Sequence, residues 1–230
     1  MQAAFVWLGG ALFVASLASF AFVYAIVLGR PTPVNAVSTG LAIGVDVAMF
    51  SVFALHHSAM ARSGAKKWIT DVIPPTLERS LYVWISSALF LGVTWMWIPV
   101  PGVAWELSGA WQWVGRAAQL LGLWLTARAA GALDPLELAG IRQFYGRCRP
   151  VEFKAAGPFG FVRHPIYLGW ILIVFGSPLM TMSRLAMAVV SSTYLIVAIP
   201  LEERSLIEAF GDGYREYTRR VRWRLIPLLW

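Results

Sequence analysis

Residues 3–28 form an uninterrupted run of 26 residues without a charged side chain. At about 1.5 Å per residue, a helix of this length crosses the roughly 30 Å hydrocarbon core of a bilayer. The run has no basic segment before it and is longer than the apolar part of a secretory signal. It therefore predicts a first membrane span and not a cleaved peptide.

Further apolar runs follow, separated by proline, glycine and charged residues. With 58% hydrophobic and 13% charged residues, the chain is predicted to be an all-α polytopic membrane protein with about six transmembrane helices. The five later spans are expected at about 38–57, 78–99, 111–130, 165–182 and 185–201. Apolar residues at spacings of three and four in 202–224 then predict an amphipathic helix at the membrane surface.

Basic residues gather on one side of these predicted spans. If the spans alternate in direction, 16 of the 19 Lys and Arg fall on the side that holds the loop after the second span, the 131–163 loop and the C-terminal tail. The positive-inside rule then places this side and both termini in the cytoplasm. Orientation accounts for the net charge of +7, so we do not expect nucleic acid as a partner.

Some charged residues lie inside predicted spans. Asp46 and Arg128 are candidates for function because charges at membrane depth are costly, and they are equally candidates for pairing with each other or with another helix. A channel or transporter using this pair stays open as an alternative. The single cysteine, Cys148, excludes an internal disulfide, and with three histidines we expect no metal site.

Polar residues also stand at both ends of the last predicted hairpin. Arg163 and His164 precede Pro165, which suits a first helical turn because it lacks an N–H group. The N-terminal end of that helix would favour an anion beside a cation and an imidazole. Glu202 and Glu203 follow at the other end. A ligand with a carboxylate, hydroxyls and a positive centre would find partners here; alternatively, the acids only neutralise structural arginines.

The order and spacing of these residues resemble the C-terminal signature of the isoprenylcysteine carboxyl methyltransferase and phospholipid methyltransferase superfamily. The resemblance implies an integral membrane enzyme whose cytoplasmic C-terminal region binds S-adenosyl-L-methionine and which methylates a lipophilic acceptor. It implies cofactor contacts for Arg163, His164, Pro165, Tyr167, Gly169, Glu202, Glu203 and Tyr214.

The earlier segments 57–62, 74–82 and 140–143 are similar to the methanethiol S-methyltransferase branch, bacterial membrane proteins that make dimethyl sulfide. This similarity implies a multi-pass protein of the bacterial inner membrane that acts on a small lipophilic thiol among membrane lipids. We accordingly expect a four-helix N-terminal transmembrane region, 1–130, and a catalytic region, 131–230.

An alkyl thiol reacts as its thiolate and benefits from a base or a nearby cation. His57, Arg142 and Glu203 are the residues predicted to lower the cost of forming the thiolate. For His57 the alternative is a helix-end histidine bonded to backbone. Two alternatives stay open within the family. One is methylation of a prenylcysteine carboxylate or a lipid, and the other is a non-catalytic membrane scaffold. The sequence leaves the oligomeric state open, and also whether the 131–163 loop is a lid.

Overall fold

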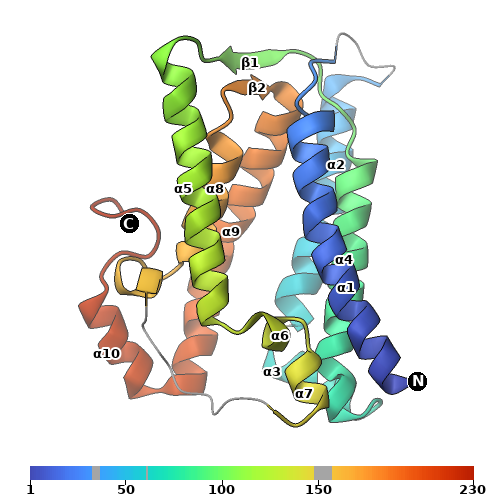
Figure 1. Ribbon diagram of the computed structural model, residues 1–230. Coiled ribbons are helices and arrows are strands. Elements are labelled where there is room, and N and C mark those ends of the chain that lie inside the picture. Colours follow the sequence, from blue (N-terminus) through green and yellow to red (C-terminus); the bar gives the residue numbers. More distant parts are fainter. Residues whose placement is uncertain (33–36, 61, 148–156) are drawn as a thin grey trace. The chain divides into compact units, whose positions relative to one another are not determined.

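The computed structural model describes residues 1–32, 37–60, 62–147 and 157–230, and most of its regular structure is helical (Figure 1). Two short strands, β1 (Val103–Glu106) and β2 (Leu179–Thr181), pair with each other. Cys148 and the centre of the predicted 131–163 loop lie outside the described residues. The helical elements are α1 (Gln2–Phe22), the π-helix η1 (Val23–Val27), α2 (Thr39–Met60), α3 (Ser63–Thr70), α4 (Pro75–Met96), α5 (Ala110–Ala132), α6 (Pro135–Leu138), α7 (Ile141–Phe144), the 3₁₀-helix η2 (Gly157–Gly160), α8 (Pro165–Phe175), α9 (Met182–Phe210) and α10 (Asp212–Arg220).

The chain divides into two compact units. The first comprises 1–102, 134–148 and 181–183, and the second comprises 103–133, 149–180 and 184–230. Helix α5 therefore packs with the C-terminal elements, whereas α6 and α7 pack with the N-terminal helices. The predicted regions 1–130 and 131–230 are based on hydropathy and chemistry, whereas the two units are defined by contacts. These two regions stay a prediction.

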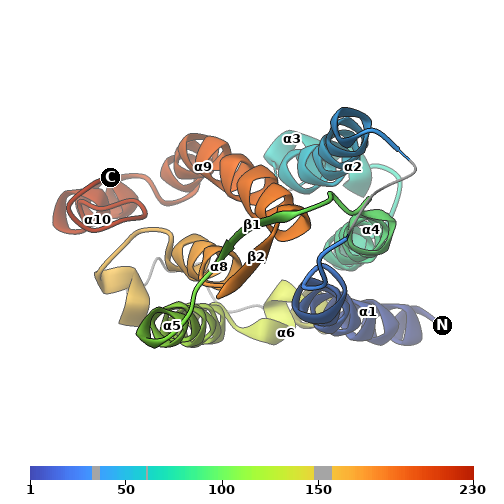
Figure 2. The ribbon, with the colours of Figure 1, turned by 90° about the horizontal axis from the view of Figure 1, so that it is seen from above.

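In the first unit, α4 contacts both α1 and α2 (Figure 2). Aromatic side chains fill both contacts. The rings of Phe5 and Trp84 stack with centroids 5.6 Å apart, and the Trp84 indole N–H donates to the Phe5 carbonyl at 2.9 Å. Between α2 and α4, the rings of Phe53 and Phe90 lie 5.2 Å apart. These contacts join α1 and α2 through α4.

Helices α6 and α7 pack on the same unit, and Gly140 between them approaches α4 closely. Gly140 has a φ of +78°, and a Cβ at this position would lie 2.9 Å from the Ser80 amide nitrogen. A side chain would therefore be excluded by both backbone conformation and space. Beside it, Ile141 is buried in a cluster with Val6 and Ala139. The described part of the predicted loop before residue 148 is thus folded against α1 and α4.

In the second unit, α5 and α8 approach closely where each presents glycine. A Cβ at Gly122 would lie 2.5 Å from the Gly169 carbonyl oxygen, and one at Gly115 would lie 2.7 Å from the Gly176 carbonyl oxygen. Small residues let two helix backbones approach in this way, as is typical of membrane helices. Helix α8 also contacts α9, because the Trp170 indole N–H donates to the Ser191 hydroxyl at 2.9 Å.

The predicted span 165–182 is wrong in extent, because α8 ends at Phe175 after 11 residues. Gly176 and Pro178 interrupt the helix, and β2 follows. Residues 183–184, which separate the last two predicted spans, are helical, because α9 already begins at Met182. Hydropathy does not distinguish an apolar strand from an apolar helix, so the apolar run 165–182 gives no sign that the helix ends within it.

Helix α9 extends well past the predicted end of the sixth span at residue 201. It includes Pro200 and ends at Phe210, and Gly211 follows with a φ of +56°. The predicted amphipathic helix 202–224 is therefore two pieces, the end of α9 and the separate helix α10. Charged residues end an apolar run without ending a helix, which explains the difference.

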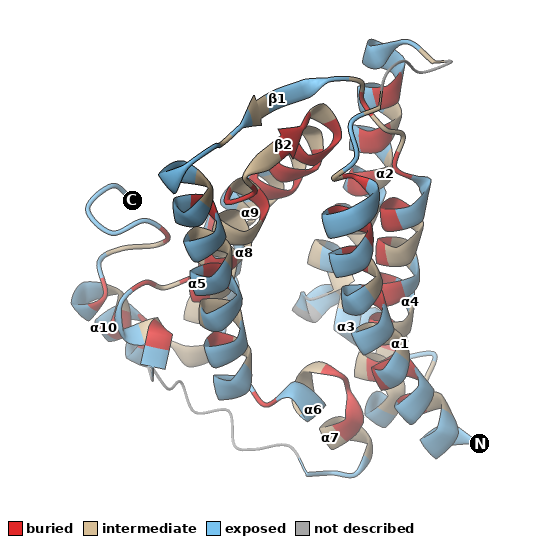
Figure 3. Cartoon of the chain, turned by 45° about the horizontal axis from the view of Figure 1, so that its top comes forward, coloured by how far each residue is buried: buried red, intermediate tan, exposed pale blue. Residues whose placement is uncertain are grey.

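Among the described residues, three helices are long and apolar enough to cross a membrane: Gln2–Val27, Thr39–Met60 and Met182–Phe210. Much of the surface of α1 is exposed, and its exposed residues include Leu8, Val14 and Leu17 (Figure 3). Exposed apolar helix surface of this extent is typical of lipid contact. Spans at α4, α5 and α8 stay predictions.

Candidate functional site

The site in the second unit is built where the chain enters α8. Pro165 occupies the first turn of this helix, as predicted. The two residues before it pair through their backbones with a distant segment: the Arg163 N–H donates to the Trp223 carbonyl, and the His164 N–H donates to the Arg224 carbonyl, each at 2.9 Å. This pairing brings the C-terminal segment alongside the start of α8.

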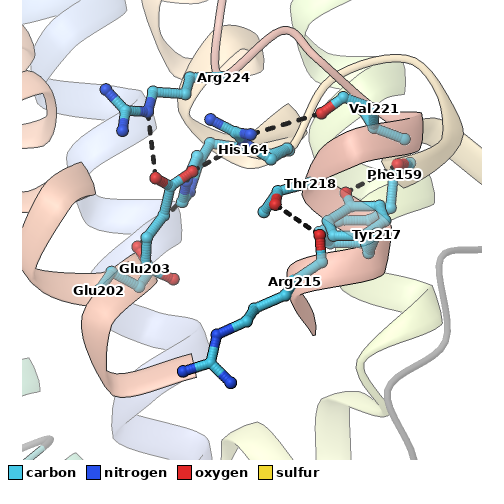
Figure 4. A network of polar contacts seen from close by, with 10 residues as sticks. Phe159, His164, Glu202, Glu203, Arg215, Tyr217, Thr218, Val221 and Arg224 are labelled. Carbon is cyan, nitrogen blue, oxygen red and sulfur yellow. Dashed lines mark hydrogen bonds and ion pairs between the residues drawn. The ribbon is translucent and has the colours of Figure 1, made fainter. Parts of the chain in front are cut away.

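Glu203 is the centre of the polar contacts that result (Figure 4). Its Oε1 lies 2.7 Å from Arg163 Nε, and its Oε2 lies 3.0 Å from Arg224 Nε. The Glu203 side chain is only 9% exposed and that of Arg163 only 10%, so the charges are largely removed from water. Two guanidinium groups on one carboxylate stabilise its ionised form, which makes Glu203 a weak proton acceptor.

His164 and Tyr167 extend this cluster toward Glu202. His164 Nε2 lies 3.5 Å from Glu203 Oε1, and His164 Nδ1 lies 3.6 Å from Glu202 Oε2. The Tyr167 hydroxyl donates to Glu202 Oε2 at 2.6 Å, and its ring stacks on that of His164 with centroids 5.3 Å apart. The His164 side chain is 4% exposed, whereas that of Glu202 is 43% exposed. Glu202 is therefore the more accessible of the two acids in the cluster.

Helix α10 contributes two buried tyrosines. Tyr214 and Tyr217 are each 1% exposed and pack with Val221 against residues of α9. The Tyr217 hydroxyl donates to the Phe159 carbonyl at 2.8 Å. Burial raises the pKa of Tyr217 to about 12 and raises the pKa of Tyr214 as well. Tyr214 thus lies in the packing beside the cluster; its cofactor contact stays a prediction.

Gly169, also predicted as a cofactor contact, lies where α8 meets α5. A Cβ here would collide with the Thr126 hydroxyl and lie 2.7 Å from the Gly122 carbonyl oxygen. Helix packing therefore accounts for this glycine. A direct role in cofactor binding stays a prediction.

Of the predicted catalytic residues, His57 belongs to the first unit. Its Nδ1 lies 2.8 Å from the Tyr82 hydroxyl. The Tyr82 ring in turn lies 4.7 Å from the Arg79 guanidinium carbon. A side chain therefore contacts the His57 ring, and its catalytic role stays a prediction.

Arg142 is also in the first unit and is fixed by an acid. Its Nε and Nη2 lie 3.1 Å and 3.0 Å from Asp134 Oδ2. Asp134 has a φ of +57°, which is rare outside glycine, and its other carboxylate oxygen accepts the Leu136 N–H. The backbone at Asp134 is thus held in an unfavourable conformation that presents its carboxylate to Arg142.

Asp46, the acid within a predicted span, accepts a hydrogen bond from the Ile98 N–H at 2.8 Å. This contact supports its structural interpretation. Among the described residues, no three His, Cys, Asp or Glu side chains are grouped so that they hold a metal ion.

Sequence reasoning missed Arg224. The C-terminal tail is rich in arginine, but the spacing of these arginines does not distinguish Arg224 from its neighbours. The contact with Glu203 depends on the backbone pairing of 223–224 with 163–164, which no local pattern reveals.

These features define a class, the helical integral membrane proteins with a polar cluster between the start of one helix and the body of a neighbouring helix. Residues 110–213 match the model of the family described as phospholipid methyltransferase, and this stretch includes α5, α8, α9 and the acids of the cluster. The chain belongs to this family, which confirms the resemblance of its C-terminal signature.

Three similar proteins carry two different names. Methanethiol S-methyltransferase from Mycobacterium tuberculosis is 38% identical over 191 residues, covering 79% of this chain and 77% of the relative. Methanethiol S-methyltransferase 2 from Bradyrhizobium diazoefficiens is 37% identical over 208 residues, covering 88% and 78%. Nurim from Xenopus laevis is 33% identical over 168 residues, covering 66% and 58%. No solved structure matches the chain significantly.

Proposed function

We propose that this protein is an integral membrane methyltransferase that uses S-adenosyl-L-methionine and methylates a small thiol, converting methanethiol to dimethyl sulfide. The observation that carries the proposal is the cluster of Glu203 with Arg163 and Arg224, beside the accessible pair of Tyr167 and Glu202. Most of this cluster lies inside the stretch that matches the family, and relatives named methanethiol S-methyltransferase cover most of the chain.

The residues of the cluster fit the proposed cofactor. When bound, S-adenosyl-L-methionine supplies an electrophilic methyl group on a positively charged sulfur. The Glu202 carboxylate, 43% exposed, can accept hydrogen bonds from an ammonium group or ribose hydroxyls. The first turn of α8 and His164 suit a carboxylate, because helix N-termini present unpaired N–H groups. We propose that Arg163, His164, Pro165, Tyr167, Glu202 and Glu203 form this binding site.

We assign Glu203 a positioning role. Because two arginines hold its charge, it is poorly suited to take a proton from a thiol. Its contacts instead fix the start of α8, the body of α9 and the C-terminal segment relative to one another. In-line methyl transfer depends mainly on such alignment and on the exclusion of water.

The acceptor thiol must also be converted to its thiolate. A thiol at neutral pH is mostly protonated, so a base or a cation raises its reactive fraction. We propose His57 as the proton acceptor and Arg142 as the stabilising cation. Tyr82 and Asp134 hold these two side chains in place.

A lipid or prenylcysteine carboxylate is the second candidate acceptor, favoured by the description of the matched family. The acceptor assay is therefore a panel of methanethiol, a prenylated cysteine and a phospholipid. The non-catalytic scaffold predicts no transfer to any of them.

Calorimetric titration of the detergent-purified protein with S-adenosylhomocysteine tests the proposal. We expect binding by the wild type, and a dissociation constant about tenfold higher for Glu202→Gln, since one charged hydrogen-bond partner is lost. Arg204→Gln is the matched control, because Arg204 is an exposed neighbour on α9 and also loses one charge. A folded wild type that does not bind would contradict the methyltransferase proposal and favour the scaffold.

A further inference from the structure

The first unit contains a small hollow that the proposed reaction does not use as a cofactor site. Its volume is about 220 Å³. It is formed by the second turn of α1 and by the segment of α6, α7 and the residues that follow. The lining residues are Trp7, Leu136, Ile141, Arg142, Tyr145 and Arg147.

The charge of this hollow favours an anion. Two arginines line it, and Asp134 neutralises one of them through contacts of 3.1 Å and 3.0 Å to the Arg142 guanidinium. Arg147 is exposed, with its guanidinium carbon 5.9 Å from the centre of the Tyr145 ring. Arg142, Arg147 and Asp134 together therefore carry a net charge of +1. Arginine binds phosphate oxygens through paired N–H groups.

The remaining walls are apolar and aromatic. The Trp7 indole N–H donates to the Tyr145 hydroxyl at 3.2 Å, which links α1 to the segment after α7. Leu136 and Ile141 supply hydrocarbon. A fully hydrated anion gains little from such walls, whereas an anion attached to an apolar chain gains from both parts of the hollow.

The position of Trp7 indicates the depth of the hollow in a membrane. Residues 2–27 form a candidate span, and their length of about 39 Å exceeds the roughly 30 Å hydrocarbon core. Trp7 is near one end of this span, at the level where tryptophan and tyrosine favour the interface. Trp7 and Leu8 are 52% and 58% exposed, so apolar surface continues from the hollow along α1.

We propose that the hollow binds the phosphate group of an anionic glycerophospholipid, with the acyl chains lying along the exposed surface of α1. Arg147 contacts the phosphate, and Trp7 and Tyr145 contact the glycerol and the upper acyl chain. The hollow contains none of the residues of the cofactor cluster, which belongs to the second unit. It shares Arg142 with the proposed formation of the thiolate, so the test changes Arg147 and leaves Arg142 in place.

Native mass spectrometry of the full chain in detergent tests this proposal. The protein is offered equal amounts of phosphatidylglycerol and phosphatidylcholine, and the ratio of the two adducts is measured. Loss of one charged partner predicts that Arg147→Gln lowers this ratio by about tenfold. Arg116→Gln is the control, because Arg116 is also an arginine beside an aromatic ring, 5.6 Å from that of Trp113, but lies outside the hollow.

Three results would overturn the lipid site. The first is a wild type that does not distinguish the two lipids, and the second is an Arg147→Gln ratio equal to that of the wild type. The third comes from a competition arm with glycerol phosphate, which carries the headgroup chemistry without tails. Displacement of the lipid by an equal concentration of glycerol phosphate would assign the hollow to a soluble phosphate. Arg147 is exposed, so its variant should unfold at the wild-type temperature.

Discussion

The Nε atom of Arg163 lies 2.7 Å from Oε1 of Glu203, and this pair joins the residue two places before the start of α8 to the body of α9. Both side chains are at most 10% exposed. Arg224 contacts the other carboxylate oxygen from the C-terminal segment. One carboxylate therefore links three segments that are distant in sequence, and the geometry of the candidate cofactor site depends on it.

Glu203→Gln should be strongly destabilising. The substitution leaves the largely buried Arg163 guanidinium without its counter-charge, and removal of one partner of a buried pair typically costs about 3 kcal/mol or more. We expect a clear decrease in the thermal unfolding temperature of the detergent-purified protein, and loss of S-adenosylhomocysteine binding. Arg204→Gln, on the exposed side of α9, should unfold as the wild type does. Equal unfolding temperatures for Glu203→Gln and wild type would show that the pair contributes nothing.

Tyr167→Phe separates ligand binding from stability. It removes the hydroxyl that donates to Glu202 at 2.6 Å but keeps the ring stacked on His164. Because Glu202 is partly exposed, water can replace this bond in the unliganded protein, and the unfolding temperature should change little. The Glu202 carboxylate would be less well oriented, so the dissociation constant for S-adenosylhomocysteine should rise about fivefold, or about 1 kcal/mol. An unchanged dissociation constant in calorimetry would remove Tyr167 from the site.

Gly122→Ala tests the close contact of α5 and α8. The new Cβ would lie 2.5 Å from the Gly169 carbonyl oxygen, so the helices must separate, at a cost of about 1–3 kcal/mol. Gly92→Ala is the control, because a Cβ at this position in α4 meets no atom within 4 Å. Alanine there should be neutral or stabilise by up to about 1 kcal/mol through helix propensity. The contact is unimportant if both variants unfold at the same temperature.

Stability should fall in alkaline solution through the buried tyrosines of α10. Burial raises the pKa of Tyr217 to about 12, above its ordinary value near 10. The unfolded chain therefore loses this proton first. The stabilising effect is fully present below pH of about 10 and is lost as the pH rises toward about 12.

Thermal unfolding against pH, with tyrosinate absorbance recorded in parallel, measures this effect. Tyr217→Phe should reduce the decrease in unfolding temperature between these two pH values. Part of the decrease should remain in this variant, because the pKa of Tyr214 is also raised. A variant as pH-dependent as the wild type would contradict the assignment to Tyr217.

Much of the helical arrangement follows from simple sequence patterns. The uncharged run 3–28 predicts the helix observed at 2–27, and Pro165 correctly marks the start of α8. The sequence also indicates that Arg163 and His164 meet Glu202 and Glu203, because a helical hairpin brings its two ends together. These inferences depend on local composition and on one topological argument, which is why they are reliable.

Other features depend on contacts that no local pattern reveals. Hydropathy could not show that α8 ends at Phe175, because the strand that follows is equally apolar. Nor could it show that α9 continues to Phe210, because a helix that leaves the membrane keeps its backbone hydrogen bonds. The role of Arg224 required the pairing of two distant backbone segments. The hollow beside Trp7 required the fold of the whole first unit.

Transfer of an isotopically labelled methyl group tests the central proposal most directly. The purified protein is supplied with labelled S-adenosyl-L-methionine and methanethiol, and the gas phase is analysed for labelled dimethyl sulfide. We predict labelled product from the wild type and from Arg204→Gln, and strongly reduced product from Glu202→Gln. A wild type that binds S-adenosylhomocysteine but forms no labelled dimethyl sulfide, or places the label on a lipid or prenylcysteine instead, would contradict the thiol as acceptor.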